Sequence, residues 1–139
     1  MDTPTSSGLA LAERLRDALN RHDLEAMANC FARDFVNETP VHPTRSFQGR
    51  EQVRKNWAQI FAGVPDLVAD ILRSSVRGNA VWTEWEMRGT RRDGALHLMR
   101  GVSIFEVGEG EFASVRFYLE PVEAGGISID AAIKQAVGR

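Results

Sequence analysis

The sequence of 139 residues is long enough for one domain, and its content of 43% hydrophobic and 26% charged residues is typical of a globular protein. The net charge of −2 arises from 17 Lys and Arg interspersed with 19 Asp and Glu, so no basic stripe can neutralise a nucleic-acid backbone. No apolar run reaches the roughly 18 residues of a membrane span and no signal-peptide pattern opens the chain, which predicts a cytoplasmic protein without membrane or nucleic-acid partners.

Three amphipathic helices are predicted in the first half of the chain. Residues 1–8 are expected to be a flexible leader, and residues 9–19 carry apolar side chains every three or four positions, which predicts the first helix. The second helix begins after Asp23, a capping residue, and its apolar stripe extends to Phe31. The third helix begins after Gly49. Its apolar face carries Val53, Trp57, Ile60 and Phe61.

A short strand, Phe35–Thr39, is predicted between the second and third helices, and it ends at Pro40. Asn37 and Thr39 are the residues expected on its buried side. Buried amides and hydroxyls need hydrogen-bond partners. The strand therefore predicts an interior space that is not simply filled with hydrocarbon, where a ligand or water can be the partner.

The second half of the chain has the apolar period of two that is typical of strands. Turn residues divide it into four predicted strands, and this pattern predicts antiparallel hairpins. They span residues 67–76, 80–90, 96–107 and 111–120. Residues 124–139 are expected to form a linker and a short helix that begins at Ser128. Helices followed by an antiparallel meander predict one α+β domain over residues 9–123, with the helices on one face of the sheet.

Four segments resemble the SnoaL-like branch of the nuclear transport factor 2-like superfamily: Asn20–Met27, Phe47–Val53, Arg100–Phe105 and Arg116–Glu120. The resemblance implies a strongly curved antiparallel sheet wrapped around three helices, with an apolar pocket inside and often a dimer. Members of the superfamily include polyketide cyclases, steroid isomerases, epoxide hydrolases, dehydratases and non-catalytic binding modules. The fold alone therefore does not select an activity.

Two known catalytic sets of the superfamily are missing from this sequence. Thr39 stands where the resemblance places the base carboxylate of the steroid isomerases, and Ser103 stands at their second acid. Trp85 and Met87 stand where the epoxide hydrolases have an Arg and an Asp. Neither set can form here.

Asn37 and Glu120 do match parts of the family patterns. Asn37 corresponds to the water-positioning amide of the epoxide hydrolases, and Glu120 to the acid that closes the last strand in hydrolases and SnoaL-type cyclases. A carboxylate at the mouth of an apolar cavity loses hydration and becomes a useful proton carrier. Strand alternation, however, places Glu120 outside with Arg116 and Tyr118, unless a bulge turns it inward. Both orientations remain open.

His97 is the third catalytic candidate. If Val107 pairs with Glu111 in the last hairpin, His97 lies on the inner face beside Glu120 and Pro121. A histidine near an acid can serve as general acid or base, and the alternative is a histidine at the rim bonded to a backbone carbonyl.

The remaining histidines and the single cysteine have structural interpretations. His42 lies between two prolines, as an exposed loop residue that can border the mouth, and His22 is a favourable cation near a helix C-terminus. Cys30 reads as a buried hydrophobe. Because no ligand set with metal spacing is present, neither a metal nor a cofactor is expected.

The pocket wall is expected to combine aromatic, thioether and hydroxyl side chains. The candidate substrate-binding residues are Thr39, Trp57, Phe61, Thr83, Trp85, Met87, Met99, Ser103, Phe117 and Tyr118. A two-residue turn at Asp93-Gly94 would instead align Glu84 and Glu86 with the inner positions Ser103 and Gly101, but the resemblance favours Trp85 inside. Trp82, Leu98, Val102 and Ile104 would form an outer apolar surface, which predicts a homodimer.

Two functions compete on this reading. The first is a SnoaL-like pocket protein that carries out proton transfer, of cyclase, isomerase or hydrolase type, on an apolar carbonyl or polycyclic compound without a cofactor. His97 and Glu120 would carry protons and Asn37 would orient the substrate or water. The second is a non-catalytic module of the same fold that binds a small apolar ligand or a protein.

Overall fold

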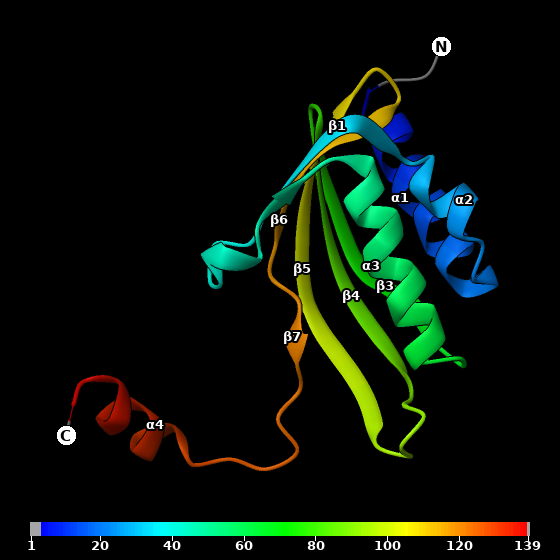
Figure 1. The fold of residues 1–139 in the computed structure, drawn as a ribbon. Helices are drawn as coiled ribbons and strands as arrows, with labels where there is room; N and C mark the ends of the chain where they lie inside the picture. The colour runs from blue at the N-terminus through cyan, green and yellow to red at the C-terminus, as the bar shows by residue number, and fades with distance from the viewer. Residues whose placement is uncertain (1–3, 139) are drawn as a thin grey trace.

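The computed structural model describes residues 4–138, with side chains from residue 8 onward. In this part the chain forms an α+β fold, as predicted (Figure 1). The helices are α1 (Pro4–Arg21), α2 (Leu24–Ala28), the 3-10 turn η1 (Pro43–Arg45), α3 (Arg50–Gly63) and α4 (Ile129–Ala136). The strands are β1 (Phe31–Glu38), β2 (Phe47–Gln48), β3 (Val68–Arg77), β4 (Ala80–Thr90), β5 (Leu96–Gly108), β6 (Glu111–Phe117) and β7 (Glu120–Pro121).

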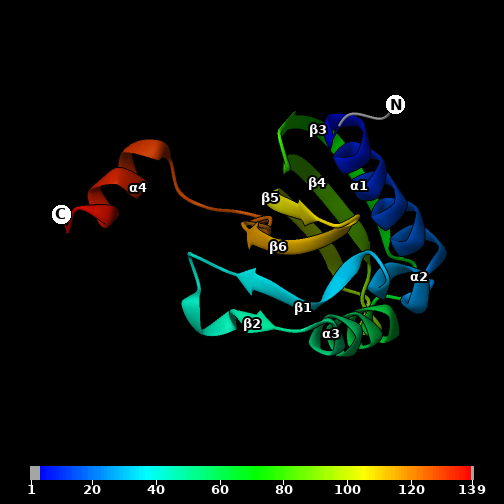
Figure 2. The same ribbon diagram turned by 90° about the horizontal axis from the view of Figure 1, so that it is seen from above.

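The strands form one curved, open sheet in the order β2-β1-β6-β5-β4-β3, and β7 pairs with β5. Neighbouring strands run antiparallel except β1 and β6, which are parallel and so make the sheet mixed. Figure 2 shows α1, α2 and α3 together on the same side of the sheet. We call this the concave face, and the opposite one the convex face.

The hydrophobic core lies between the concave face and the helices. The α1 helix buries Leu11, Leu15 and Leu19 against the sheet, in agreement with the predicted apolar period. His22 ends α1 with a positive φ of 54°, and the Asp23 carboxylate then accepts a hydrogen bond from Ala26 N to begin α2. Burying this apolar stripe is what holds the helices on the sheet.

The structure corrects the boundary between the second helix and the first strand. The α2 helix ends at Ala28, and β1 begins at Phe31 instead of Phe35, so the predicted helical stripe extended too far. The cause is tertiary: Phe112 N donates to Cys30 O at 2.8 Å, and this bond to β6 holds the chain extended. Cys30 is buried as expected, and burial raises the pKa of its thiol.

The ends of the chain differ from the simple expectations. Of the leader predicted over residues 1–8, residues 4–8 belong to α1 and residues 1–3 lie outside the described part. The C-terminal helix forms, with the Ser128 hydroxyl accepting from Ala131 N at 3.2 Å. Both views show α4 pointing away from the sheet, and its apolar side chains Ile129 and Ile133 are exposed (Figures 1 and 2).

The β4–β5 hairpin has the register that the family resemblance favoured. Trp85 pairs with Gly101 and lies on the concave side, whereas Glu84 pairs with Val102 on the convex side, which rules out the alternative alignment. Arg91 N donates to Ala95 O, and Gly94 adopts a positive φ of 87° inside this turn. The loop therefore has three residues instead of two, and glycine suits its left-handed position.

The convex face mixes the predicted apolar surface with ion pairs. Trp82 is 48% exposed and pairs with Ile104 across the strands. Further along β4 on the same face, Glu86 accepts from Arg88 and from Arg100. The homodimer expected through this face stays a prediction, which the mass of the protein in solution will test. Within residues 4–138, the helices are too short or too polar to cross a bilayer.

Candidate functional site

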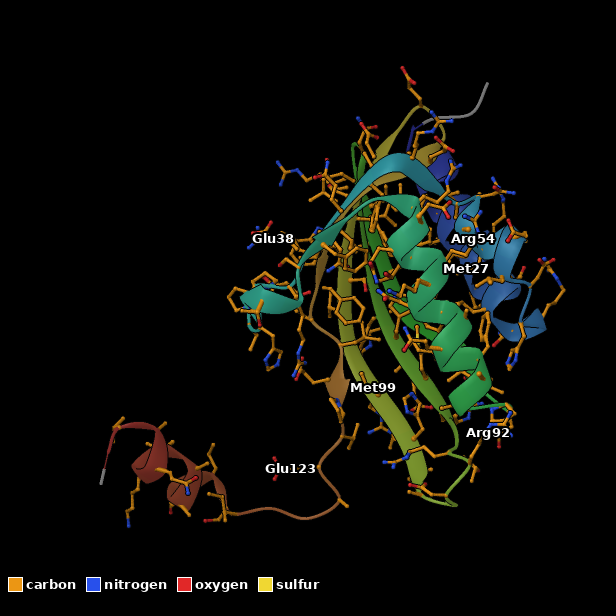
Figure 3. The ribbon with its side chains drawn as sticks, in the orientation of Figure 1. Met27, Glu38, Arg54, Arg92, Met99 and Glu123 are labelled. Atoms are coloured by element: carbon orange, nitrogen blue, oxygen red, sulfur yellow. The ribbon has the colours of Figure 1, made fainter. Side chains whose placement is uncertain are left out.

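A cavity of about 310 Å³ lies between the concave face of the sheet and α3. This volume is at the lower end of the range of roughly 300 to 1,000 Å³ for small-molecule sites. Most of its wall is apolar or aromatic, and Figure 3 shows the side chains that fill the space between β5 and α3, with Met99 labelled among them. Polar side chains line the cavity at a few places only.

Trp85 forms part of the deep wall and is held by a buried hydroxyl. Only 1% of Trp85 is exposed, and its indole Nε1 donates to Thr83 Oγ1 at 2.7 Å. The Thr83 hydroxyl in turn donates to Ser103 O at 3.1 Å. Thr83 therefore orients the indole from behind and does not itself line the cavity.

Two polar residues, one in β1 and one directly after it, face the cavity, as the sequence predicted. Asn37 and Thr39 are both buried and line it, and Asn37 Nδ2 donates to Thr39 Oγ1 at 2.9 Å. Within the described residues, Asn37 Oδ1 and the hydroxyl of Ser103 have no hydrogen-bond partner, yet neither is sealed from open space. These atoms, together with the proton of the Thr39 hydroxyl, can bind polar groups of a ligand.

The mouth of the cavity carries the charged groups. Glu120 lines it, and Glu120 Oε1 lies 2.9 Å from Nε2 of His42, with both side chains partly exposed. His42 comes from the loop that follows β1, 78 positions earlier in the chain. Arg45 of η1 lines the same mouth. A carboxylate and an imidazole at this distance can share and pass a proton.

A close crossing beside Gly101 brings the chain from β6 to β7, where Glu120 lies. Gly101 has a φ of 152°, and a Cβ there would lie 2.2 Å from Tyr118 O. The absent side chain lets Tyr118 and Leu119 cross close to β5 after β6 ends at Phe117. Pairing then resumes with Glu120 opposite Arg100. This register continues that of Ser103 with Phe117, so no residue is inserted, and the Glu120 side chain lines the cavity at its mouth although its strand partner Arg100 lies on the convex face.

The predicted neighbourhood of His97 is wrong. Val107 pairs with Phe112, not with Glu111, and His97 pairs with Gly89 near the far end of the β4–β5 hairpin. His97 does face the concave side, but it lines a separate depression with Ile60 and Arg91 instead of the main cavity. Burial lowers the pKa of His97, and the nearby charge of Arg91 lowers it further.

The other predicted pocket residues divide into two groups. Those that line the cavity are Thr39, Trp57, Trp85, Met87, Met99, Ser103 and Phe117. Those that do not line it are Thr83, Phe61 and Tyr118. Phe61 stacks on His22 with ring centroids 4.6 Å apart, and the Tyr118 hydroxyl lies 3.5 Å from Nη2 of Arg116. His22 also bonds Leu67 O through Nε2 at 2.9 Å.

Sequence reasoning did not assign a site role to Arg45, Asn56 or His42. His42 was recognised as a loop residue near the mouth, but its partner Glu120 is remote in sequence and no local pattern links them. Asn56 lies among the apolar residues of α3, where Gln52 Nε2 donates to its Oδ1 at 2.8 Å. A polar residue inside an apolar helical stripe was the one signal available. Among the described residues, no group of three His, Cys, Asp or Glu side chains is arranged to hold a metal ion.

Comparison with known proteins agrees with this geometry. A family described as the SnoaL-like domain matches residues 12–115. A search of curated proteins gave no significant match. Among solved structures, a proposed SnoaL-like polyketide cyclase from Jannaschia sp. CCS1 superposes with a TM-score of 0.74 at 16% identity, covering 96% of this chain and 94% of that one.

Two further solved structures have the same fold. An LEH-like epoxide hydrolase from M. tuberculosis is similar with a TM-score of 0.71, 20% identity and 84% of each chain covered. A proposed ketosteroid isomerase from Kribbella flavida has a TM-score of 0.71 and 22% identity, with 93% of this chain and 89% of that one covered. The family match spans most of the chain, and the chain belongs to the SnoaL-like family.

Proposed function

We propose that the protein binds a small, mostly apolar carbonyl compound in the cavity and catalyses a proton transfer on it, with Glu120 and His42 as the acid–base pair. The observation that carries this proposal is the 2.9 Å contact between Glu120 and His42 at the mouth of an otherwise apolar cavity. A carboxylate in such a place is less hydrated than in water and can exchange a proton with a bound molecule.

The polar groups of the cavity have complementary roles in this proposal. The Glu120 carboxylate takes a proton from the carbon next to the ligand carbonyl, and the electron pair moves onto the carbonyl oxygen. Thr39 accepts from Asn37, so its own proton remains free to donate to that oxygen. Asn37 thus orients the donor, and His42 holds the carboxylate. Return of the proton at another atom completes an isomerisation or allows ring closure.

The similar structures support the class of ligand more than the reaction. Their names describe a polyketide cyclase, an epoxide hydrolase and a ketosteroid isomerase, all of which are named for acting on small organic molecules. At these identities they support the fold alone, so the reaction is proposed from the residues of this chain. The catalytic role predicted for His97 is not part of the proposal, because His97 lines another depression.

The test is hydrogen exchange into apolar ketones. The protein is incubated in D2O with a panel of one- and two-ring ketones, and deuterium at the α-carbon is followed by NMR. We expect Glu120→Gln to slow exchange by a factor of about 100 or more, the lower end for a general base, and His42→Ala to slow it less. His97→Ala is the matched control and should keep the full rate. Equal rates in Glu120→Gln and the unchanged protein would rule out the assigned base.

A non-catalytic binding function is the second candidate. It is favoured by the residues Thr39, Ser103, Trp85 and Met87 at the positions where the related enzymes carry catalytic groups. On this alternative the cavity holds its ligand without changing it. Mass spectrometry of the molecule that co-purifies, before and after long incubation with the protein, distinguishes the two: an unaltered ligand supports binding alone.

A further inference from the structure

Arg45 is a cation at the cavity mouth without an anionic partner among the described side chains. It is the one Arg or Lys among the described residues that line the cavity, and Glu120 is the one acid. Among residues 8–138, no side chain forms a hydrogen bond or ion pair with the Arg45 guanidinium, and Glu120 is instead engaged by His42. The five donors of this guanidinium are therefore available to a ligand.

The loop that carries Arg45 is internally braced. Thr39 N donates to Ser46 Oγ at 3.0 Å, which closes the loop at its base. Inside it, His42 N donates to Thr39 O at 3.0 Å and Arg45 N donates to His42 O at 2.9 Å. His42 and Arg45 thus share one fixed scaffold, so the charged groups of the mouth need little reorganisation to meet a ligand.

The polarity of the cavity runs from an apolar depth to a charged mouth. Trp85 and Phe105 lie deep and are almost fully buried, whereas Arg45 is exposed at the entrance. At roughly 30 Å³ for each water volume, the cavity holds the equivalent of about ten waters. A ligand that fits has one or two rings or a short acyl chain, with its polar end outward.

From this arrangement we propose that the ligand is a carboxylate, whose apolar body fills the cavity and whose carboxylate group is bound by Arg45 at the mouth. The planar guanidinium matches a carboxylate with two parallel hydrogen bonds, which an ammonium group cannot reproduce. The like charge of Glu120 is offset on one side by its bond to His42. This inference rests on the proposed function, since it names the class of molecule that the same cavity takes.

The test compares two probes of nearly the same size and shape, of which one is an anion and the other is neutral: naphthalene-2-carboxylate and naphthalene-2-carboxamide. Binding to the full chain is measured by isothermal titration calorimetry. We expect the carboxylate to bind about tenfold more tightly than the amide, in line with a charge-assisted hydrogen-bonded pair. Arg45→Gln should abolish this preference without changing amide binding, and Arg45→Lys should keep part of it.

Arg33→Gln is the matched control. Arg33 is also an exposed arginine without an ion pair among the described side chains, but it lies on β1 away from the cavity lining. This variant should bind both probes as the unchanged protein does. The melting temperature of Arg45→Gln should be unchanged, which separates a binding effect from unfolding.

The outcomes separate the two proposals. If the unchanged protein binds the amide but has no preference for the carboxylate, or if Arg45→Gln keeps the preference, the carboxylate inference is wrong while the proposed function stands. If neither probe binds, the cavity does not accept a two-ring apolar molecule, and both proposals fail.

Discussion

The two faces of strand β4 show how one short sequence serves two different environments. On the concave side, Thr83 and Trp85 are closed off from solvent and joined by a hydrogen bond of 2.7 Å. On the convex side, Trp82 is half exposed and Glu86 takes part in ion pairs with Arg88 and Arg100. The same residue type, tryptophan, therefore has a fixed structural role on one face and an accessible position on the other.

The contrast between the buried contacts of the concave face and the ion pairs of the convex face indicates which interactions stabilise this fold. Buried apolar area and satisfied buried hydrogen bonds carry most of the stability, because their loss leaves a cavity or an unpaired polar group. Exposed ion pairs are screened by water and salt and contribute little. The convex face can therefore change with small effect, while the concave face that shapes the cavity cannot.

The largest difference in stability between the two faces is expected when each tryptophan is replaced by alanine. Trp85→Ala should lower the free energy of unfolding by about 3 to 5 kcal/mol, because it empties a large buried volume. Trp82→Ala, on the face opposite the cavity, should lower it by about 1 kcal/mol or less, because half of this side chain is already exposed. Urea unfolding followed by circular dichroism measures both. Equal losses would contradict the division between the two faces.

Gly101 tests the close crossing of Tyr118 and Leu119 beside β5, which leads to Glu120. Gly101→Ala should destabilise the protein by about 2 kcal/mol or more, because the new Cβ meets the Tyr118 carbonyl and the φ of 152° disfavours it. The displaced crossing should also weaken ligand binding. Gly63→Ala is the control: it lies at the end of α3 with open space around it, so stability should stay the same or rise slightly. Chemical unfolding and calorimetry of the same samples give both effects.

The smallest effect is expected on the convex ion pairs. Glu86→Gln removes the acid shared by Arg88 and Arg100 and should cost about 1 kcal/mol or less. Raising the salt concentration should shrink the difference further, because exposed charges are screened. Unfolding midpoints at low and high salt check this. A large loss that salt leaves unchanged would show that this network stabilises the fold as strongly as the buried face does.

The site was predictable from sequence where it depends on local period, and not where it depends on remote pairing. Asn37 and Thr39 were expected inside because alternate residues of a strand share a face, whereas Trp85 was placed inside by the family resemblance; all three line the cavity. The contact of His42 with Glu120 was not expected, because it joins a loop after β1 to a short strand 78 positions later. His97 was placed wrongly because the prediction assumed that Val107 pairs with Glu111. In the structure Val107 pairs with Phe112, which changes the register of β5 against β6.

The sequence by itself determined the α+β class, the helices that flank Asp23 and follow Gly49, and the inward positions of Asn37 and Thr39. These features follow from side-chain periodicity, which each segment carries on its own. Tertiary structure alone decided the start of β1 at Phe31, the place of Glu120 at the cavity mouth, and the meeting of His42 with that carboxylate. Such features depend on how strands pair and cross, because a bulge or a shift of register changes which residues meet without changing the local pattern.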